Sequence, residues 1–468
     1  MATGHRPNVR LRALLTETGW TGQQLAGAVN DLGVEAGVTL RYGRAAVAHW
    51  LAGMRPRSPV PDLVAEALSR RLGRPLTAAE IGLSRPERAP RDPAGADSSA
   101  PAGADAGGAA WWEADALAGL VELHAGPRPG RRRVLEECVY NLAALTVPGW
   151  ADATVAAVTA GGGRDPAPRI GAPQVEAAAA MAQVFSYTDT AFGGGQARRA
   201  LSGYLAVDVV PWLRCRMSSA TRRRMLSIAA ELTYLCGFMC FDEQLHGAAQ
   251  RYYQAALKLA AENGDAVGYA VTLRALSVQA YTLGHHRHAL DLAEAALSGV
   301  PGTIEPGTRA FLHGQAAVAA AASRSECRAA LTHLRAAEHH LDHAVATTGT
   351  GAETVGAYHQ ASLAHQHAAV LTALEDRPAA VEALTTSIRH RPATERRARA
   401  LTSATLAVLY LDQGHLEQAA ATWHTFLDDY PHLSSGRTRA ALATLRARLR
   451  PYQRNTLARG VLQRAATM

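Results

Sequence analysis

Apolar residues along most of the chain recur at the three- and four-residue spacing of amphipathic helices. This pattern predicts four helices near the N-terminus, each bounded by capping residues, glycine or proline, and four or five more before the middle of the chain. The first four are predicted at 9–18, 21–31, 43–52 and 61–72, and the later ones at 111–124, 132–145, 151–160, 172–192 and 196–213.

A segment without aromatic or large aliphatic side chains, residues 85–110, interrupts this pattern. Such a segment cannot bury enough apolar surface to order itself, so we predict a flexible linker there. The linker separates a small helical bundle at 1–84, here called the head, from a helical region at 111–225 that leads into a repeat domain at 226–468.

The second half shows small and aromatic residues at recurring offsets, which is the pattern of tetratricopeptide-like (TPR-like) helix pairs. The last equivalent positions of successive units, at 256, 296, 337, 387 and 426, are 40, 41, 50 and 39 residues apart, longer than the ideal ~34. The recurring positions of the second helices are Ala249, Tyr253, Ala256; Ala289, Ala293, Ala296; Ala330, Leu334, Ala337; Ala380, Leu384, Ser387; and Ala419, Trp423, Phe426.

We therefore predict an α-superhelical array, whose concave groove is lined by the first helix of each pair. Such a groove suits an extended peptide or a partner helix. The alternative is that its lining is ordinary repeat surface and that the array serves dimerisation. The side chains expected in the groove are Tyr234, Arg274, Tyr281, Gln315 and His365.

Composition agrees with an all-α fold, because the chain is rich in alanine and has only 6% aromatic residues. Five cysteines, an odd number, do not make a disulfide framework and favour a reducing cytoplasm. No apolar run reaches the ~18 residues of a membrane span, so neither secretion nor a membrane partner is expected.

The positive charge is concentrated near the N-terminus. Residues 1–92 contain 13 arginines and 8 acidic residues, which leaves +5 of the total +8 there and +3 for the remaining 376 residues. No acidic residue lies between Glu35 and Asp62, where four arginines occur. Such a stripe indicates a phosphate-contacting surface, or else a merely solvated basic face. The net charge of +3 on the remaining residues does not require a nucleic-acid partner.

The same segment resembles the helix-turn-helix of phage-repressor-like (XRE) regulators over residues 8–83. The residues that carry this resemblance are Gln24-Leu25-Ala26, the run from Arg44 to Gly53, and Arg55-Pro56-Arg57. The predicted connection between the second and third helices is about ten residues, whereas the usual turn has three or four. A further stretch, Phe192 to Leu201, is similar to one in actinobacterial regulators that join such a head to a helical-repeat body.

The resemblance implies roles for individual residues on double-stranded DNA. The start of the recognition helix, Arg44 and Ala45, would read base edges, and Ala48 and His49 would follow one turn later. For His49 the alternative is a solvated helix residue. Three flanking arginines would contact phosphates and supply affinity without sequence information; these are Arg41, Arg55 and Arg57.

Catalytic motifs are missing from the sequence. We find no Gly-x-Ser-x-Gly, Walker A or HExxH motif, and we interpret His339 and His343 as exposed helix residues rather than metal ligands. Three glycines at 193–195 could cradle a phosphate but are more typical of a tight turn. We expect no enzyme activity, cofactor or metal.

The sequence therefore predicts a cytoplasmic transcription regulator whose repeat body dimerises and/or binds a peptide or protein signal. The alternative is an interaction scaffold whose basic head binds a protein and not DNA.

Overall fold

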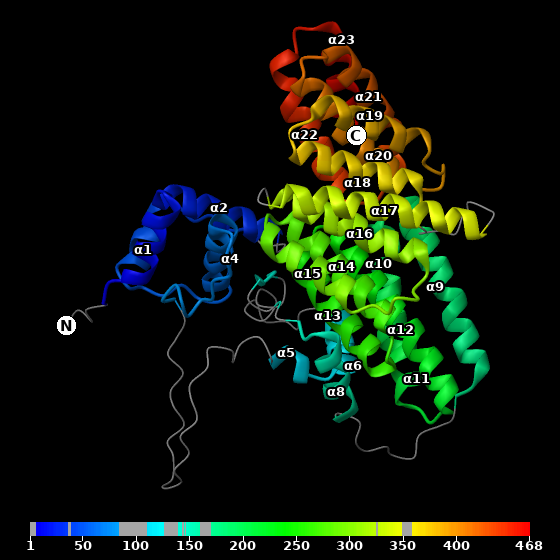
Figure 1. The fold of residues 1–468 in the computed structure, drawn as a ribbon. Helices are drawn as coiled ribbons and strands as arrows, with labels where there is room; N and C mark the ends of the chain where they lie inside the picture. Colours follow the sequence, from blue (N-terminus) through cyan, green and yellow to red (C-terminus); the bar gives the residue numbers. More distant parts are fainter. Residues whose placement is uncertain are drawn as a thin grey trace. The chain divides into compact units, whose positions relative to one another are not determined.

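The computed structural model describes residues 6–35, 39–83, 110–125, 139–142, 145, 147–159, 170–323, 326–348 and 358–468. These residues form helices and contain no strand (Figure 1), so the all-α prediction is confirmed. The predicted linker lies outside this set apart from Ala110, and so does most of the predicted helix 132–145. The chain divides into two compact units: residues 1–148 with 245–248, and residues 149–244 with 249–468.

The head, in the first unit, is a bundle of four helices around one apolar core. Trp50 and Leu25 are almost wholly buried in this core, together with Leu63 from the last helix. The four helices are α1 (Val9–Thr18), α2 (Gly22–Glu35), α3 (Arg44–Leu51) and α4 (Val60–Leu72); the same unit also contains α5 (Ala110–Glu113) and α6 (Ala116–Ala125).

Capping residues explain where the helices of the head begin and end. The side chain of Asn8 accepts a hydrogen bond from the Leu11 N–H at the start of α1, and α2 follows a reciprocal capping box of Thr21 and Gln24. Helix α2 continues four residues beyond the predicted end, because Leu32 is buried in the core. The connection to α3 is therefore residues 36–43, shorter than the predicted one.

The second unit opens with helices that the apolar pattern located well. The predicted helix 172–192 has those bounds, whereas the predicted helix 196–213 contains a π-helical turn at Leu205–Val209. These leading helices are α8 (Trp150–Thr159), α9 (Ala172–Phe192), α10 (Gly194–Tyr204) and α11 (Val210–Arg214).

Five antiparallel helix pairs follow, as the repeat pattern predicts, and two further helices cover the last pair (Figure 1). The pairs are α12 (Ser219–Asp242) with α13 (His246–Asn263), α14 (Ala266–Thr282) with α15 (His286–Ser298), α16 (Pro306–Ala322) with α17 (Cys327–Thr348), α18 (Gln360–Ala373) with α19 (Arg377–Arg389), and α20 (Arg396–Asp412) with α21 (Leu416–Asp429); α22 (Gly436–Leu449) and α23 (Thr456–Ala466) complete the unit.

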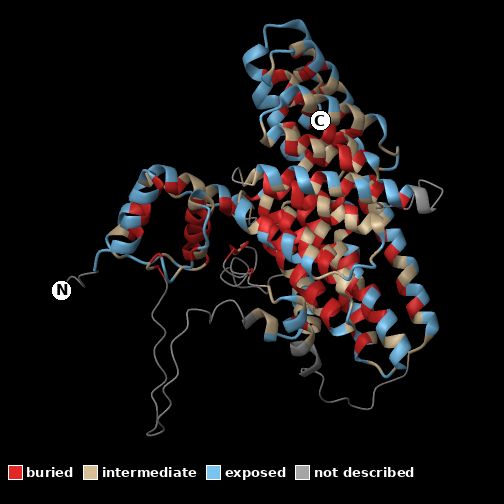
Figure 2. Cartoon of the chain, viewed as in Figure 1, coloured by how far each residue is buried: buried red, intermediate tan, exposed pale blue. Residues whose placement is uncertain are grey.

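The recurring positions of the second helices form the inside of the stack. All fifteen are buried, and the most exposed of them, Leu334, has only 4% of its surface accessible. Figure 2 shows the buried residues along the facing sides of these helices. The TPR-like architecture therefore follows from small and aromatic side chains at helix crossings. Helix α12 is long and apolar enough to span a membrane, but 72% of its apolar window is buried in this stack.

The turn inside each pair repeats one backbone conformation. A residue with positive φ ends the first helix at Gln244 (63°), Gly284 (84°), Glu375 (67°) and Gly414 (81°). The corresponding turn of α16 and α17 includes residues 324–325, outside the described set. Equivalent turns show that the units are true structural repeats despite their unequal spacing.

The leading helices also contact the end of the array. Helix α9 packs on both α12 and α20, and α10 packs on α12. A Cβ on Gly194 would lie 2.7 Å from the Met239 carbonyl oxygen, so this position requires glycine for close approach. The Gly194 N–H donates to the Asp242 carboxylate (2.9 Å) and the Gly195 N–H to the Ser434 carbonyl (2.9 Å). The three glycines thus form a packed turn whose N–H groups already have protein partners.

Candidate functional site

Helix α3 of the head presents a polar face and buries the opposite one. Val47 is fully buried and Trp50 retains 3% exposure, and the indole packs edge-on against Tyr42 with ring centroids 5.3 Å apart. The outward residues are those expected on DNA: Arg44, Ala45, Ala48 and His49 are all exposed.

Side chains from α2 hold α3 in place. The Arg44 backbone N–H, at the first residue of α3, donates to Gln23 Oε1 (3.1 Å), which satisfies a helix-terminal donor. Asn30 exchanges two hydrogen bonds with the backbone of Tyr42, at 2.9 and 2.8 Å. At the other end, the Leu51 carbonyl accepts from the Asn8 N–H (2.9 Å). Both ends of α3 and the segment entering it are therefore fixed.

Two groups of arginines in the head differ in their partners. On α4 and just after it, Arg70 binds Glu35 (2.8 Å) and Glu66 (2.9 Å), and Arg74 binds Glu17 (2.9 Å). The guanidinium groups around α3 have no hydrogen bond or ion pair among the described residues and are exposed; they belong to Arg41, Arg44, Arg55 and Arg57. Four arginines without an acidic partner thus surround α3; Arg6, Arg10 and Arg12, before and on α1, likewise have no acidic partner among the described residues.

Sequence reasoning missed Gln23 and Asn30. Their role is to bond the backbone 21 and 12 residues further on, and a cap supplied from so far away has no local sequence signature. All seven residues expected on DNA are exposed, and they lie on α3 and its two flanks.

The residues expected in the repeat groove do lie on first helices, but they separate into different environments. Tyr234 and Arg274 interact electrostatically. Gln315 is buried, and its amide donates to Ser277 Oγ (3.0 Å), so it serves packing between α14 and α16. Tyr281 lines a cavity of about 620 Å³ at the turns of the helix pairs, together with His286, Thr372, Glu375, Arg377 and Asp412.

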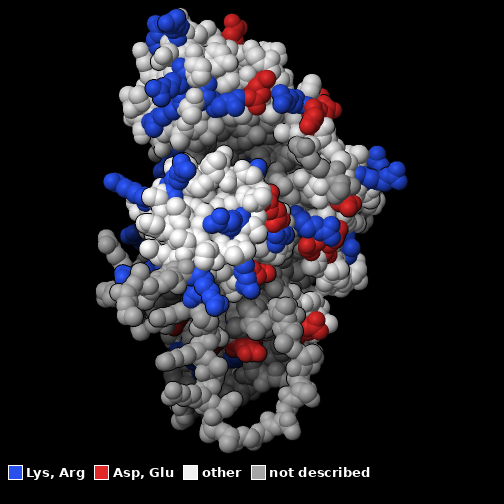
Figure 3. All heavy atoms as spheres, turned by 90° about the vertical axis from the view of Figure 1, so that its left-hand side faces the viewer, with Lys and Arg blue, Asp and Glu red and all other residues white. Residues whose placement is uncertain are grey.

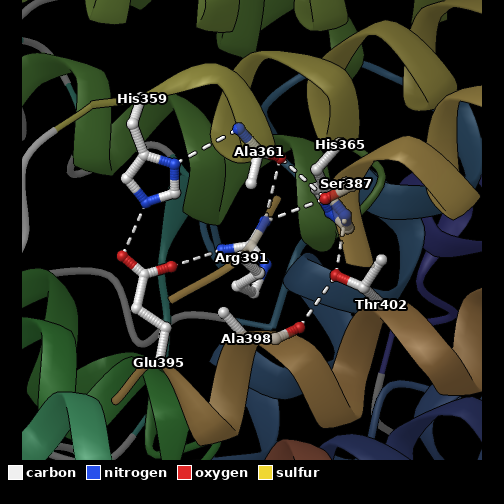
Figure 4. A network of polar contacts seen from close by, with 8 residues as sticks. All are labelled: His359, Ala361, His365, Ser387, Arg391, Glu395, Ala398 and Thr402. Carbon is white, nitrogen blue, oxygen red and sulfur yellow. Dashed lines mark hydrogen bonds and ion pairs between the residues drawn. The ribbon is translucent and has the colours of Figure 1, made fainter. Parts of the chain in front are cut away.

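His365 belongs to a polar network between α18, α19 and α20 (Figure 4). Its Nδ1 lies 3.2 Å from Thr402 Oγ1, and that hydroxyl donates to the Ala398 carbonyl. Since the hydroxyl has one proton, His365 Nδ1–H is the donor in the first bond. Burial, with the charges of Arg391 and Arg437, lowers the pKa of His365 to about 4. The imidazole is therefore neutral at pH 7 and serves helix packing.

The same network contains an ionic chain. Glu395 binds His359 (2.7 Å) and Arg391 (2.6 Å), and Arg391 also donates to the Ala361 carbonyl and to Ser387 Oγ, both at 3.0 Å. Burial opposes ionisation of Glu395, but its two partners outweigh burial and lower the pKa of the carboxyl. This chain fixes the geometry between the fourth and fifth helix pairs.

A second ionic cluster connects the leading helices to the end of the array. Arg397 binds Asp189 (2.7 Å) and lies 3.8 Å from Asp242, while Arg437 binds Asp242 at 2.9 Å. Burial would lower the pKa of Arg397, yet the two carboxylates raise it. Every charge in this cluster has a partner, so we assign it to structure.

The charge outside the head is less even than expected. Residues 430–468 contain eight arginines and no acidic residue, and Figure 3 shows Lys and Arg gathered over these C-terminal helices at the top of the view. Several are neutralised by neighbours, such as Arg439 by Glu243 (3.0 Å) and Arg448 by Asp412. The expectation of a small charge spread along the body is therefore wrong for its last two helices.

Among the described residues, no group of three or more His, Cys, Asp or Glu could hold a metal ion. Cys236 and Cys240, one turn apart, are buried in the core.

Comparison with known proteins gives a match for the head. A family model described as the SP15 N-terminal domain matches residues 11–84, less than half of the chain. No curated protein matches. Among solved structures, a monomeric IFIT1 mutant with Gppp-AAAA is 14% identical with a TM-score of 0.34, covering 67% of this chain and 70% of that one. A second monomeric IFIT1 mutant, with m7Gppp-AAAA, is 15% identical with a TM-score of 0.34, covering 72% and 73%.

Proposed function

We propose that the chain is a sequence-specific DNA-binding transcription regulator of the XRE type. The observation that carries this proposal is the set of exposed guanidinium groups around α3 that have no acidic partner among the described residues. Arginine side chains that are not held in ion pairs within the protein can neutralise the phosphates of DNA. The anchoring of α3 by Gln23 and Asn30 supports it further, because a reading helix must be held rigidly.

In this proposal α3 contacts the base edges, and the segments on either side of it contact the phosphates. Arg44 and Ala45, at the start of α3, face base edges in the major groove, followed by Ala48 and His49. The flanking arginines, Arg41, Arg55 and Arg57, contact phosphates. Arginine pairs bidentately with guanine, so Arg44 supplies direct readout, which is worth ~1–3 kcal/mol of discrimination.

The TPR-like body serves as the interaction part of the regulator. We propose that it dimerises and/or binds a peptide or protein signal, and so biases the affinity or spacing of paired heads on DNA. Stacked helix pairs give an extended surface for such a partner.

Selection of the full chain against a randomised DNA duplex library tests the proposal. Enrichment of a defined motif, lost in the Arg44→Ala protein, supports it. Tight binding to an acidic protein without any enriched duplex would instead favour the scaffold alternative.

A further inference from the structure

Arg274 of α14 is an arginine without a carboxylate partner among the described residues of the repeat body. Its guanidinium carbon lies 3.6 Å from the ring centroid of Phe311 on α16. The other groups that interact with it electrostatically are the hydroxyls of three tyrosines, Tyr234, Tyr253 and Tyr358. Its Nε is buried and has no hydrogen-bond partner in the described part of the chain. Desolvation lowers the pKa of Arg274, and the three tyrosine hydroxyls oppose this only in part.

Two other arginines inside the body are paired, whereas Arg198 also has a buried Nε without a hydrogen-bond partner among the described residues. Arg397 has Asp189 and Asp242, and Arg391 has Glu395 at 2.6 Å. Removing a charge from water destabilises the folded state unless a partner of opposite charge compensates. Arg274 therefore differs from these two internal arginines, because the described residues give it aromatic neighbours in place of a carboxylate.

The side chains around Arg274 are mostly buried but keep some accessible surface. Arg274, Tyr234, Phe311 and Tyr358 each keep part of their surface accessible. The rings come from separate elements and form two tilted pairs. The ring centroids of Tyr234 and Tyr253 are 5.9 Å apart, and those of Phe311 and Tyr358 are 5.5 Å apart. Together they make a cage of aromatic rings around one cation, here called the Arg274 cage.

We propose that the Arg274 cage binds a carboxylate group carried by a ligand with an aromatic or apolar side, such as the carboxylate of an extended peptide. This proposal deepens the signal-binding part of the proposed function and rests on it. Phe311 lies over the guanidinium, so a ligand carboxylate would approach the N–H groups at the guanidinium edge in a bidentate contact. The rings supply the apolar contact.

A carboxylate fits the charge of the cage better than a phosphate does. The cage holds one guanidinium, and the groups that act on Arg274 are tyrosines. Asp189 acts on Tyr234 and Glu338 acts on Tyr358, so negative charge is also present near the cage. A phosphate monoester carries ~1.5–2 negative charges at pH 7, so it would remain partly uncompensated. One guanidinium balances one carboxylate.

Ligand-detected NMR titration of the full chain tests this proposal with three probes: 3-phenylpropionate, its neutral amide, and phenyl phosphate. We expect the carboxylate to bind at about 10 mM or below, and the amide to bind about tenfold more weakly because it loses the charge-assisted contact. Arg274→Gln should weaken the carboxylate about tenfold as well, while Arg274→Lys retains part of the affinity. Arg328→Gln, an exposed arginine on α17, is the matched control and should leave binding unchanged.

Three results would overturn the proposal: no binding of the carboxylate to the wild-type chain, equal binding of carboxylate and amide, or unchanged binding by the Arg274→Gln protein. Tighter binding of phenyl phosphate than of the carboxylate would show that the cage is a phosphate site instead. Duplex binding measured on the same samples separates this outcome from the proposed function, because the DNA contacts lie in the head.

Discussion

The side chain of Gln23 accepts a hydrogen bond from the backbone N–H of Arg44, at 3.1 Å. This contact joins the first turn of α2 to the first residue of α3 and so sets where the predicted DNA-reading helix begins. It also places Arg44 at a helix N-terminus, where the helix dipole adds to its positive charge.

Gln23→Ala should lower the stability of the head and weaken DNA binding. The change leaves a helix-terminal N–H without its protein acceptor, which costs about 1 kcal/mol. Amide hydrogen exchange of α3 in increasing urea measures the stability of the head, because the seven tryptophans of the chain lie in both units. Gln23→Glu keeps an acceptor at this position and should restore most of the stability; equal loss in both variants would contradict the capping role.

Glu375→Gly should stabilise the repeat body. Glu375 has φ of 67° at the turn where Gly284 has 84° in another pair. A non-glycine residue in this conformation costs about 1 kcal/mol, and glycine relieves that cost. Gly284→Ala, the reverse exchange at the equivalent turn, should destabilise by a similar amount. Calorimetry measures the melting temperature of each variant relative to the wild-type chain. Changes in melting temperature of the same sign in both variants would contradict the equivalence of the turns.

The sequence predicts the features that depend on neighbouring residues, but few of those that depend on contacts between residues far apart in the chain. Apolar spacing predicts α9 with its observed bounds, and the recurring small residues predict the helix pairs, because both depend on neighbours a few positions away. The prediction for the end of α2 is wrong, since burial of Leu32 depends on the packed core.

Contacts between distant residues explain the remaining omissions. Asp189 and Arg397 are 208 residues apart, and the rings of the Arg274 cage come from several helices, so no local pattern identifies them. The exposed side of α3 was predictable because Val47 and Trp50 share one face of the helix, whereas Ala45, Ala48 and His49 share another. Gln315, placed in the groove by the same reasoning, instead packs between helices, since the first helices also contact each other.

Arg397→Gln should strongly destabilise the second unit. The substitution leaves the buried Asp189 carboxylate without its partner at 2.7 Å, and breaking a buried pair on one side costs about 3–5 kcal/mol. Arg389→Gln, at an exposed arginine on α19, is the control and should change stability by less than about 0.5 kcal/mol. Chemical denaturation gives the free energy of unfolding of both variants. Similarly small losses in both would show that the ionic cluster of Arg397 contributes little to stability.

Acidification from pH 7 to 5 should destabilise the repeat body through His313 and His365. Burial, followed by His333 and His340, lowers the pKa of His313 to about 4, and the pKa of His365 is also about 4. The unfolded chain, with a histidine pKa of ~6.5, then binds more protons than the folded chain, so stability falls as pH drops below ~6.5. The loss by pH 5 is about 2 kcal/mol for His365 and smaller for the half-buried His313, which solvent screens.

The pH dependence is checked by urea unfolding at both pH values. Replacing His365 by Asn should reduce the difference between pH 7 and pH 5, whereas replacing the exposed His390 by Gln should not. An undiminished difference in the His365 variant would assign the acid sensitivity to other groups.

The most direct test of DNA recognition by α3 is the salt dependence of binding to the selected duplex and to a scrambled one. Wild-type affinity should fall steeply with salt. Arg57→Ala should reduce the slope of log K against log salt by about 0.9 on both duplexes, and Arg44→Ala should remove ~1–3 kcal/mol of preference for the selected duplex. Arg12→Ala, an exposed arginine on α1, should change neither. Unchanged slope and preference in both α3-region variants, or an equal effect of Arg12→Ala, would contradict DNA recognition by α3.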